Sequence, residues 1–380
     1  MFPRGRLSSL RSNDHAPGPA PLRCWVETSR GALLHNVAAL RAHTAGAGII
    51  AVVKANAYGH GAAGVVETLA GHVQMLGVAN LTEALDVATY AQGTPILILG
   101  TALAEERAAI IAGGFIPVVS SAAEAAAFAV HGPVKAHLAV DSGMGRMGIL
   151  EDDALAELRA ALAIPGVEIT GLCSHLPVAD EDDDFTHAQL QRFRALVEKA
   201  RTLAGRALLA HVENSAGAIA FPAFAPDLFR AGLAIYGIAP RAEFQPRLLP
   251  ALTWKSRVIL VRDLGPGRGV SYGRTFITER PMQIATVAAG YADGYPRQIS
   301  GHGAEVLIRG QRRPVLGRVT MDQIMVDVTG SGVTVGDEVV LLGKQGDAEI
   351  PATEVAARAG TIAWDILAGI GARVARQFVG

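Results

Sequence analysis

Between Gly48 and Gly237 the sequence repeats one pattern eight times: a short run rich in Val, Ile and Leu, then an Ala-rich stretch typical of a helix. Strands that are apolar on both faces and alternate with helices predict a parallel sheet covered by helices. Eight such units in about 190 residues predict a closed (β/α)8 barrel, an α/β fold. A doubly wound open sheet is the alternative. The eight runs are residues 48–54, 75–80, 95–100, 115–121, 137–143, 167–176, 208–214 and 228–237.

The segments before and after this repeated pattern differ from it in composition and in the spacing of their apolar residues. The first 21 residues are basic, rich in Pro, Gly and Ser, and lack an apolar segment, so they predict a disordered tail and not a signal peptide. From Ser29 apolar residues recur at helical spacing. Beyond Leu249, alternating segments separated by Gly, Pro and Asp predict a mainly β domain, and the stretch from Glu354 to Leu367 predicts a helix. The expected units are a tail over 1–21, a barrel domain over 22–248 and a β domain over 249–380.

Charge and cysteine content exclude several classes of protein. The chain has 34 basic and 35 acidic residues, a balance that leaves no electrostatic footprint for nucleic acid or an anionic membrane. Its two cysteines, Cys24 and Cys173, are too few for a disulfide framework or a multi-cysteine zinc site. The apolar runs are too short to span a bilayer. We therefore expect a soluble, cytoplasmic protein with no metal.

The first apolar run ends at Lys54, which a barrel would place at its C-terminal mouth, where such barrels carry their active sites. Burial there lowers the pKa of the ammonium and favours the neutral amine, which can form an imine with an aldehyde. A strand-end lysine that extends into solvent is the structural alternative. The chain has only five lysines, and the glycines of YGHG beside Lys54 allow a ligand close approach, so we favour the reactive lysine.

A glycine-rich loop, DSGMGRMG, follows the fifth run and contains G-x-G-x-x-G at Gly143, Gly145 and Gly148. A dinucleotide-binding fingerprint also needs an acid at the end of the next strand, whereas Glu168 stands at its beginning. A dinucleotide site is therefore disfavoured. The residue of interest in this loop is Arg146, a permanent cation that the barrel would place at its catalytic face. A surface arginine is the alternative reading.

Polar residues also follow the later runs, at the same mouth of the barrel. A hydroxyl and backbone amides beside glycine can cradle a phosphate where barrels of this type bind one. Ordinary capping and turn chemistry is the alternative. An imine-forming lysine, a phosphate cradle and an arginine on one face together indicate pyridoxal 5′-phosphate (PLP). The residues are His175 after the sixth run, Ser215 after the seventh, and Arg230, Gly232 and Leu233 around the eighth.

From Cys24 onward these motifs closely resemble alanine racemase, a fold-type III PLP enzyme. The resemblance implies interconversion of L- and D-alanine, with D-alanine supplied for peptidoglycan, by a head-to-tail homodimer whose active site lies at the interface. The motifs that carry it are AVVKANAYGHG, DSGMGRMG, SHLPVADE, HVENSAG, FRAGLAIYG, GVSYGRTF, AAGYADGY and VLGRVTMDQIMVDVTG.

The resemblance also assigns a role to individual residues. Racemisation needs two bases on opposite faces of Cα. It implies that these are Lys54, which also holds PLP, and Tyr272, which enters from the partner subunit. A hydrogen-bond chain from Tyr272 through His175 to Arg230 would make the phenol more acidic. The other implied roles are phosphate binding by Tyr58, Ser215, Gly232 and Leu233, a pyridine-nitrogen contact by Arg230, cofactor and substrate contacts by Arg146, substrate carboxylate binding by Met321, and narrowing of the entrance by Tyr291.

Two positions depart from the family pattern. Many members carry a carbamylated lysine seven residues before the arginine that corresponds to Arg146, and this chain has Ala139 there. In GTIAWDIL, Trp364 replaces a tyrosine that usually touches the phosphate and lines the substrate side, so a broader serine and alanine racemase is an open alternative. A non-catalytic PLP-binding barrel would lack the β domain. A PLP decarboxylase of this fold would place a carboxylate opposite the pyridine nitrogen, where this chain has Arg230.

Overall fold

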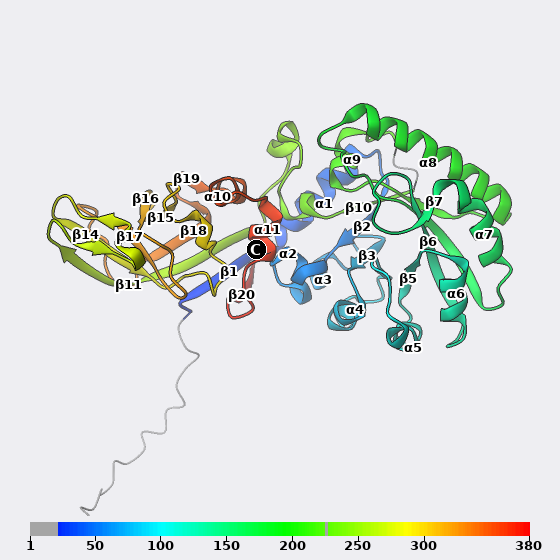
Figure 1. Cartoon of the computed structure of the whole chain (residues 1–380), viewed down its shortest axis with the longest axis horizontal. Helices are drawn as coiled ribbons and strands as arrows, with labels where there is room; N and C mark the ends of the chain where they lie inside the picture. The colour runs from blue at the N-terminus through cyan, green and yellow to red at the C-terminus, as the bar shows by residue number, and fades with distance from the viewer. Residues whose placement is uncertain (1–21, 225–226) are drawn as a thin grey trace, which may run out of the picture.

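The computed structural model describes residues 22–224 and 227–380, which form an elongated molecule with a barrel at one end and a β domain at the other (Figure 1). The predicted disordered tail over 1–21 lies outside the described residues. No helix in the described ranges has both the length and the apolar character needed to cross a membrane.

Within the described residues, eight parallel strands form the barrel. They are β2 (Gly48–Val52), β3 (Met75–Val78), β4 (Ile96–Ile98), β5 (Ile116–Val119), β6 (Val134–Asp141), β8 (Val167–Cys173), β9 (Leu209–His211) and β10 (Leu228–Ala231). Their order is β10-β2-β3-β4-β5-β6-β8-β9, with the short β7 (Ile149–Leu150) beside β6. The ring nears closure where the backbone N–H of Arg230 donates to the carbonyl of Glu213 at 2.9 Å. Every strand overlaps a predicted run, so the barrel is confirmed and the open sheet excluded.

Helices cover the outside of the barrel, and capping residues begin several of them. The hydroxyl of Ser29 accepts from the backbone N–H of Ala32 at 3.1 Å, which starts the helix predicted after Ser29. Asn80, Ser121 and Asp182 cap later helices in the same way. The helices of the barrel unit are α1 (Arg30–His43), α3 (Ala62–Leu69), α4 (Leu81–Ala88), α5 (Arg107–Ala112), α6 (Ala122–Ala129), α7 (Ala154–Leu162), α8 (Asp183–Ala204) and α9 (Ser215–Ala220). The segment labelled α2 (Lys54–Tyr58) is a short turn at the mouth of the barrel.

The second unit is built on a largely antiparallel sheet, as its alternating sequence predicts. Its strands are β1 (Cys24–Ser29), β11 (Leu252–Leu264), β14 (Met282–Val287), β15 (Glu305–Ile308), β16 (Gln311–Leu316), β17 (Ile324–Asp327), β18 (Glu338–Gln345), β19 (Ala348–Ile350) and β20 (Ala375–Val379). The order is β19-β18-β15-β16-β17-β14-β11-β1-β20. Because β18 also pairs with β11, the sheet folds back on itself around its own apolar core. A separate hairpin joins β12 (Gly269–Val270) to β13 (Phe276–Ile277).

Two segments differ from their predicted structure. Strand β1 falls in the range that the sequence assigned to the barrel domain, yet it pairs antiparallel with β11 and parallel with β20. The predicted helix from Glu354 to Leu367 is two helices, α10 (Ala352–Ala359) and α11 (Ala363–Ala368). Gly360 separates them, because its φ of +71° is the left-handed conformation that ends a helix. This break allows α11 to reach the lysine-bearing α2 of the barrel.

Candidate active site

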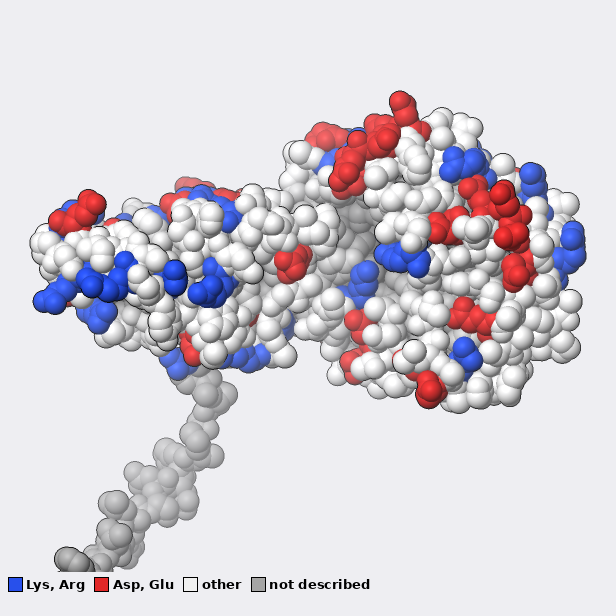
Figure 2. Space-filling view, in the orientation of Figure 1, with Lys and Arg blue, Asp and Glu red and all other residues white. Residues whose placement is uncertain are grey.

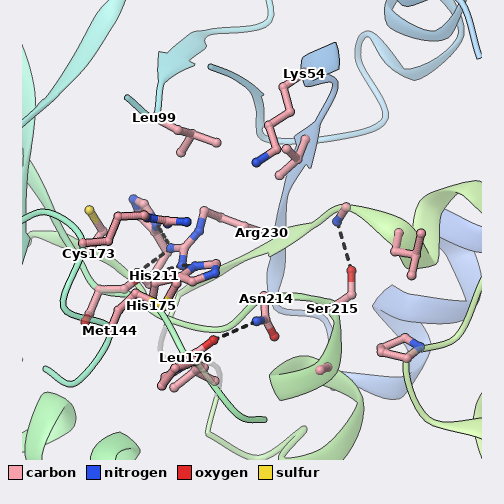
Figure 3. Close-up of a pocket in the computed structure, with 18 of the residues that line it drawn as sticks. Lys54, Leu99, Met144, Cys173, His175, Leu176, His211, Asn214, Ser215 and Arg230 are labelled. Atoms are coloured by element: carbon pink, nitrogen blue, oxygen red, sulfur yellow. Dashed lines mark hydrogen bonds between the residues drawn. The ribbon is translucent and has the colours of Figure 1, made fainter. Parts of the chain in front are cut away.

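A pocket of about 630 Å³ opens at the carboxyl ends of the barrel strands (Figure 3). All eight site residues that the sequence predicted within the barrel line it: Lys54, Tyr58, Arg146, His175, Ser215, Arg230, Gly232 and Leu233. The three predicted residues of the β domain are not among its lining residues in the described chain. Tyr272, Tyr291 and Met321 are instead 70%, 41% and 52% exposed.

Lys54 stands at the start of an unusual backbone turn, α2. The four residues Ala55–Tyr58 all have φ between 51° and 53°, the left-handed conformation that costs a non-glycine residue about 1–2 kcal/mol. Glu83 offsets part of this cost, because its carboxylate accepts from the N–H groups of Ala55 at 2.8 Å and Ala79 at 2.7 Å. The turn brings Lys54 and Tyr58 to the same pocket. Burial lowers the pKa of Lys54, and the neighbouring Arg146 lowers it further, as the sequence predicted for a reactive amine.

The predicted phosphate cradle is assembled from three strand ends. The Ser215 hydroxyl accepts from the N–H of Gly232 at 3.0 Å. A Cβ atom on Gly232 would lie 2.7 Å from the Tyr58 hydroxyl oxygen, so glycine is required there for the phenol to approach. Burial raises the pKa of Tyr58 to about 12 and keeps it a hydrogen-bond donor. The hydroxyls of Tyr58 and Ser215 and the backbone N–H of Leu233, all at this pocket, are groups that can bind the phosphate of PLP.

Arg230 is buried at the floor of the pocket and is held by many acceptors (Figure 3). Its guanidinium donates to Nδ1 of His211 at 2.6 Å and to Nδ1 of His175 at 3.0 Å. It also donates to the carbonyl oxygens of Ser174 and Val212. Burial, reinforced by the charge of Arg230, lowers the pKa of His175 to about 3 and keeps this ring neutral. The link between His175 and Arg230 that the resemblance implies is therefore present.

His211 is a site residue that the sequence analysis missed. It lies in β9, and its Nε2 atom is 2.8 Å from Nδ1 of His137 in β6, so an imidazole chain extends from Arg230 into the barrel core. The motif HVENSAG contained His211, but nothing local distinguished it from a structural histidine. The contact joins residues that are 74 positions apart.

The buried histidines predict a loss of stability in acid. Burial, with a contribution from Arg230, lowers the pKa of His137 to about 4, below the value of about 6.5 in an unfolded chain. Between these pH values the unfolded chain binds a proton that the folded chain does not. The free energy of unfolding should therefore fall as the pH drops from about 6.5 to about 4, by about 1.4 kcal/mol per pH unit for this group.

Urea unfolding of His137→Asn across this pH range measures that contribution. The pH slope of the unfolding free energy should be smaller in this variant than in wild type, by about 1.4 kcal/mol per pH unit. Equal slopes for wild type and His137→Asn would contradict a neutral, buried His137.

The loop that carries Arg146 is organised by Asp141. One oxygen of this carboxylate accepts from the N–H groups of Gly143, Met144 and Gly145 at 3.0, 2.9 and 3.1 Å. These amides are therefore occupied within the loop and do not form a pyrophosphate cradle, which agrees with the rejection of a dinucleotide site. The loop instead places Arg146 at the pocket.

Three further features of the lining determine where the pocket is apolar, aromatic or acidic. Ala139 is 5% exposed and belongs to a small apolar cluster with Cys173, so the position of the family's carbamylated lysine is hydrophobic here. Trp364 reaches the pocket from α11. Asp180 and Glu181 also line the pocket and add two carboxylates to it. Figure 2 shows acidic side chains along a rim of the hollow between the two units and basic ones inside it.

Comparison with known proteins identifies the family. Residues 28–240 match the family model "Alanine racemase, N-terminal domain", and residues 251–378 match "Alanine racemase, C-terminal domain". The alanine racemase of Symbiobacterium thermophilum is 40% identical over 366 residues, which cover 94% of this chain and 97% of that protein. That of Halothermothrix orenii is 39% identical and covers 87% and 89%.

Solved structures give the same result. The alanine racemase of Streptomyces lavendulae superposes with a TM-score of 0.86 at 34% identity, covering 95% of this chain and 98% of that one. The enzyme of Bacillus anthracis, with bound L-Ala-P, gives 0.87 at 33% identity, covering 95% and 96%. The matched domains, the sequence identities and the superposed fold all agree. The chain therefore belongs to the alanine racemase family, whose members use PLP to interconvert L- and D-alanine.

Proposed function

We propose that racemisation by this chain uses Lys54 and Tyr272 as its two bases, one on each face of the substrate Cα. PLP, when bound, withdraws electrons from an attached amino acid and makes its Cα proton acidic. The observation that carries the proposal is the position of Lys54 beside the phosphate cradle, with its pKa lowered by burial. Burial favours the neutral amine of Lys54, which can accept a proton, and Tyr272 supplies the matching phenol.

We also propose that Tyr272 reaches the pocket from a second subunit of a head-to-tail homodimer. It lies on an exposed patch away from its own pocket. The adjoining Ser271 donates its hydroxyl hydrogen to the carbonyl of Arg318, and the N–H of Tyr291 donates to Thr320 at 3.0 Å. The patch therefore also carries Tyr291 and Met321, so one surface presents the β-domain residues that the family motif assigns to the site.

The other assignments follow from charge and position. Arg230, facing the pyridine nitrogen, would disfavour protonation of the ring and so restrain side reactions such as transamination. Its bond to His175 supports a hydrogen-bond chain toward Tyr272. Arg146 would hold the phenolate oxygen of PLP and contact the substrate, the N–H of Met321 would bind the substrate carboxylate, and Tyr291 would narrow the entrance. In the cell we propose a cytoplasmic enzyme that supplies D-alanine for peptidoglycan.

Exchange of the Cα hydrogen tests the function directly. L-alanine incubated with the holoenzyme in deuterium oxide should gain deuterium at Cα and yield D-alanine, as read by mass spectrometry and chiral chromatography. Protein depleted of PLP should do neither until PLP is restored. A PLP-loaded protein without exchange would indicate a non-catalytic PLP-binding protein.

Trp364 favours a second candidate activity, racemisation of serine as well as alanine. An indole lacks the tyrosine hydroxyl and offers a single N–H donor, so it changes both the phosphate contact and the space beside the substrate. Trp364→Tyr should change the ratio of serine to alanine turnover by roughly 10-fold, the size of effect that a small change of pocket shape has on substrate choice. Racemisation rates for both amino acids measure this ratio. Unchanged rates would show that Trp364 does not set the substrate range.

A further inference from the structure

Another cavity, of about 330 Å³, lies between the barrel and the β domain, away from the PLP pocket. The barrel contributes His60 and Tyr236 to its lining, and the β domain contributes β18, β19 and the start of α10. Its apolar walls include Leu252, Leu342 and Ile350, all well buried. This volume and this mostly apolar lining are typical of sites for small molecules.

His60 supplies the cavity with a buried acceptor. Its Nδ1 atom lies 2.9 Å from the carbonyl oxygen of Tyr58 and 3.1 Å from that of Ala57. Because carbonyl oxygens only accept, Nδ1 carries the ring proton, and in the neutral ring Nε2 is then an acceptor. Burial lowers the pKa of His60 to about 4, which keeps the ring neutral.

Nε2 of His60 has no hydrogen-bond partner among the described residues, although the side chain is fully buried. Two other polar side chains of the lining, Gln245 and Glu349, are engaged elsewhere. Gln245 accepts from the N–H of Ala239 and donates to the carbonyl of Gly237, and Glu349 pairs with Lys344. A buried acceptor without a donor is costly, so the cavity favours a molecule that brings one.

We propose that this interdomain cavity binds a small, mainly apolar molecule with a hydrogen-bond donor, which His60 Nε2 accepts. Such a ligand would act next to the lysine turn. The His60 ring lies 4.4 Å from that of Tyr236, which lies 5.0 Å from that of Tyr58. The Tyr236 hydroxyl in turn donates to the carbonyl of Val52 at 2.9 Å, two residues before Lys54.

Indole and 1-methylindole test the proposal on the PLP-loaded full-length protein by isothermal titration calorimetry. The two probes share their apolar body, but only indole has an N–H donor. Indole should bind once per chain, and 1-methylindole about fivefold more weakly, which is the effect of one hydrogen bond. Equal affinities, or no binding of either probe, would overturn the proposal.

Two variants locate the binding. In His60→Asn the side-chain amide replaces the Nδ1–H donor but not the Nε2 acceptor, so the preference for indole should disappear. Thr353 is exposed and lines the cavity, so Thr353→Trp should obstruct it and abolish the binding of indole. Thr202→Trp, at an exposed position of α8, is the matched control and should bind indole normally. Normal binding of indole to Thr353→Trp would place the probe elsewhere and refute the assignment, even if His60→Asn failed to fold.

Discussion

Replacing Lys54 with alanine should reduce alanine racemisation by about 10³-fold or more, because one side chain provides both the covalent link to PLP and one of the two bases. The protein should also lose the visible absorbance of covalently held cofactor. Borohydride reduction followed by peptide mapping should find pyridoxyl-lysine at Lys54 in wild type and at no position in Lys54→Ala.

Lys344→Ala is a suitable control because that lysine is largely exposed and lies in the β domain. It should retain full activity and a normal absorbance spectrum. Recovery of the reduced adduct on another lysine, or retention of the absorbance band by Lys54→Ala after borohydride treatment and dialysis, would remove Lys54 from its assigned role.

Tyr272→Phe should leave PLP bound but impair the two directions of racemisation unequally, because only one face of Cα loses its base. If Tyr272 acts across a subunit interface, a mixture of Tyr272→Phe and Lys54→Ala subunits should recover activity that neither variant has alone. Each mixed dimer would contain one site with both bases intact. Random reassortment would then give roughly a quarter of wild-type activity.

Activity of the reassorted mixture, with mixed dimers quantified by two affinity tags, measures this recovery. A double variant, Lys54→Ala with Tyr272→Phe, mixed with Lys54→Ala provides the control, because neither type of subunit then contributes Lys54 and the mixture should stay inactive. Failure to recover activity in confirmed mixed dimers would place Tyr272 outside the partner's site. Unaltered kinetics of Tyr272→Phe in both directions would remove it as a base.

The barrel could be predicted because its signal is local and repeated. Strands buried on both faces must be apolar along their whole length, and the helices between them must alternate with them along the chain. Residues that end such strands share one mouth, so Lys54, His175 and Ser215 could be placed together without coordinates. The capped helix after Ser29 follows from a similarly local rule.

Two kinds of feature could be seen only in the tertiary structure. They are contacts between residues that are distant in sequence and backbone conformations that local preferences do not predict. The bond between Arg230 and His211 and the pairing of β1 with β11 and β20 have no local signature. The left-handed turn at Ala55–Tyr58 contradicts local preference and is held by the distant Glu83.

The lysine count and the apolar pattern were enough to select Lys54 and to put it at the mouth of a barrel. The shape of its surroundings was decided by the assembled fold, including the close approach of Tyr58 to Gly232 and the cavity behind His60. The physical reason is that propensity and hydrophobic period act over a few residues, whereas contacts between strand ends exist only once the whole sheet has closed.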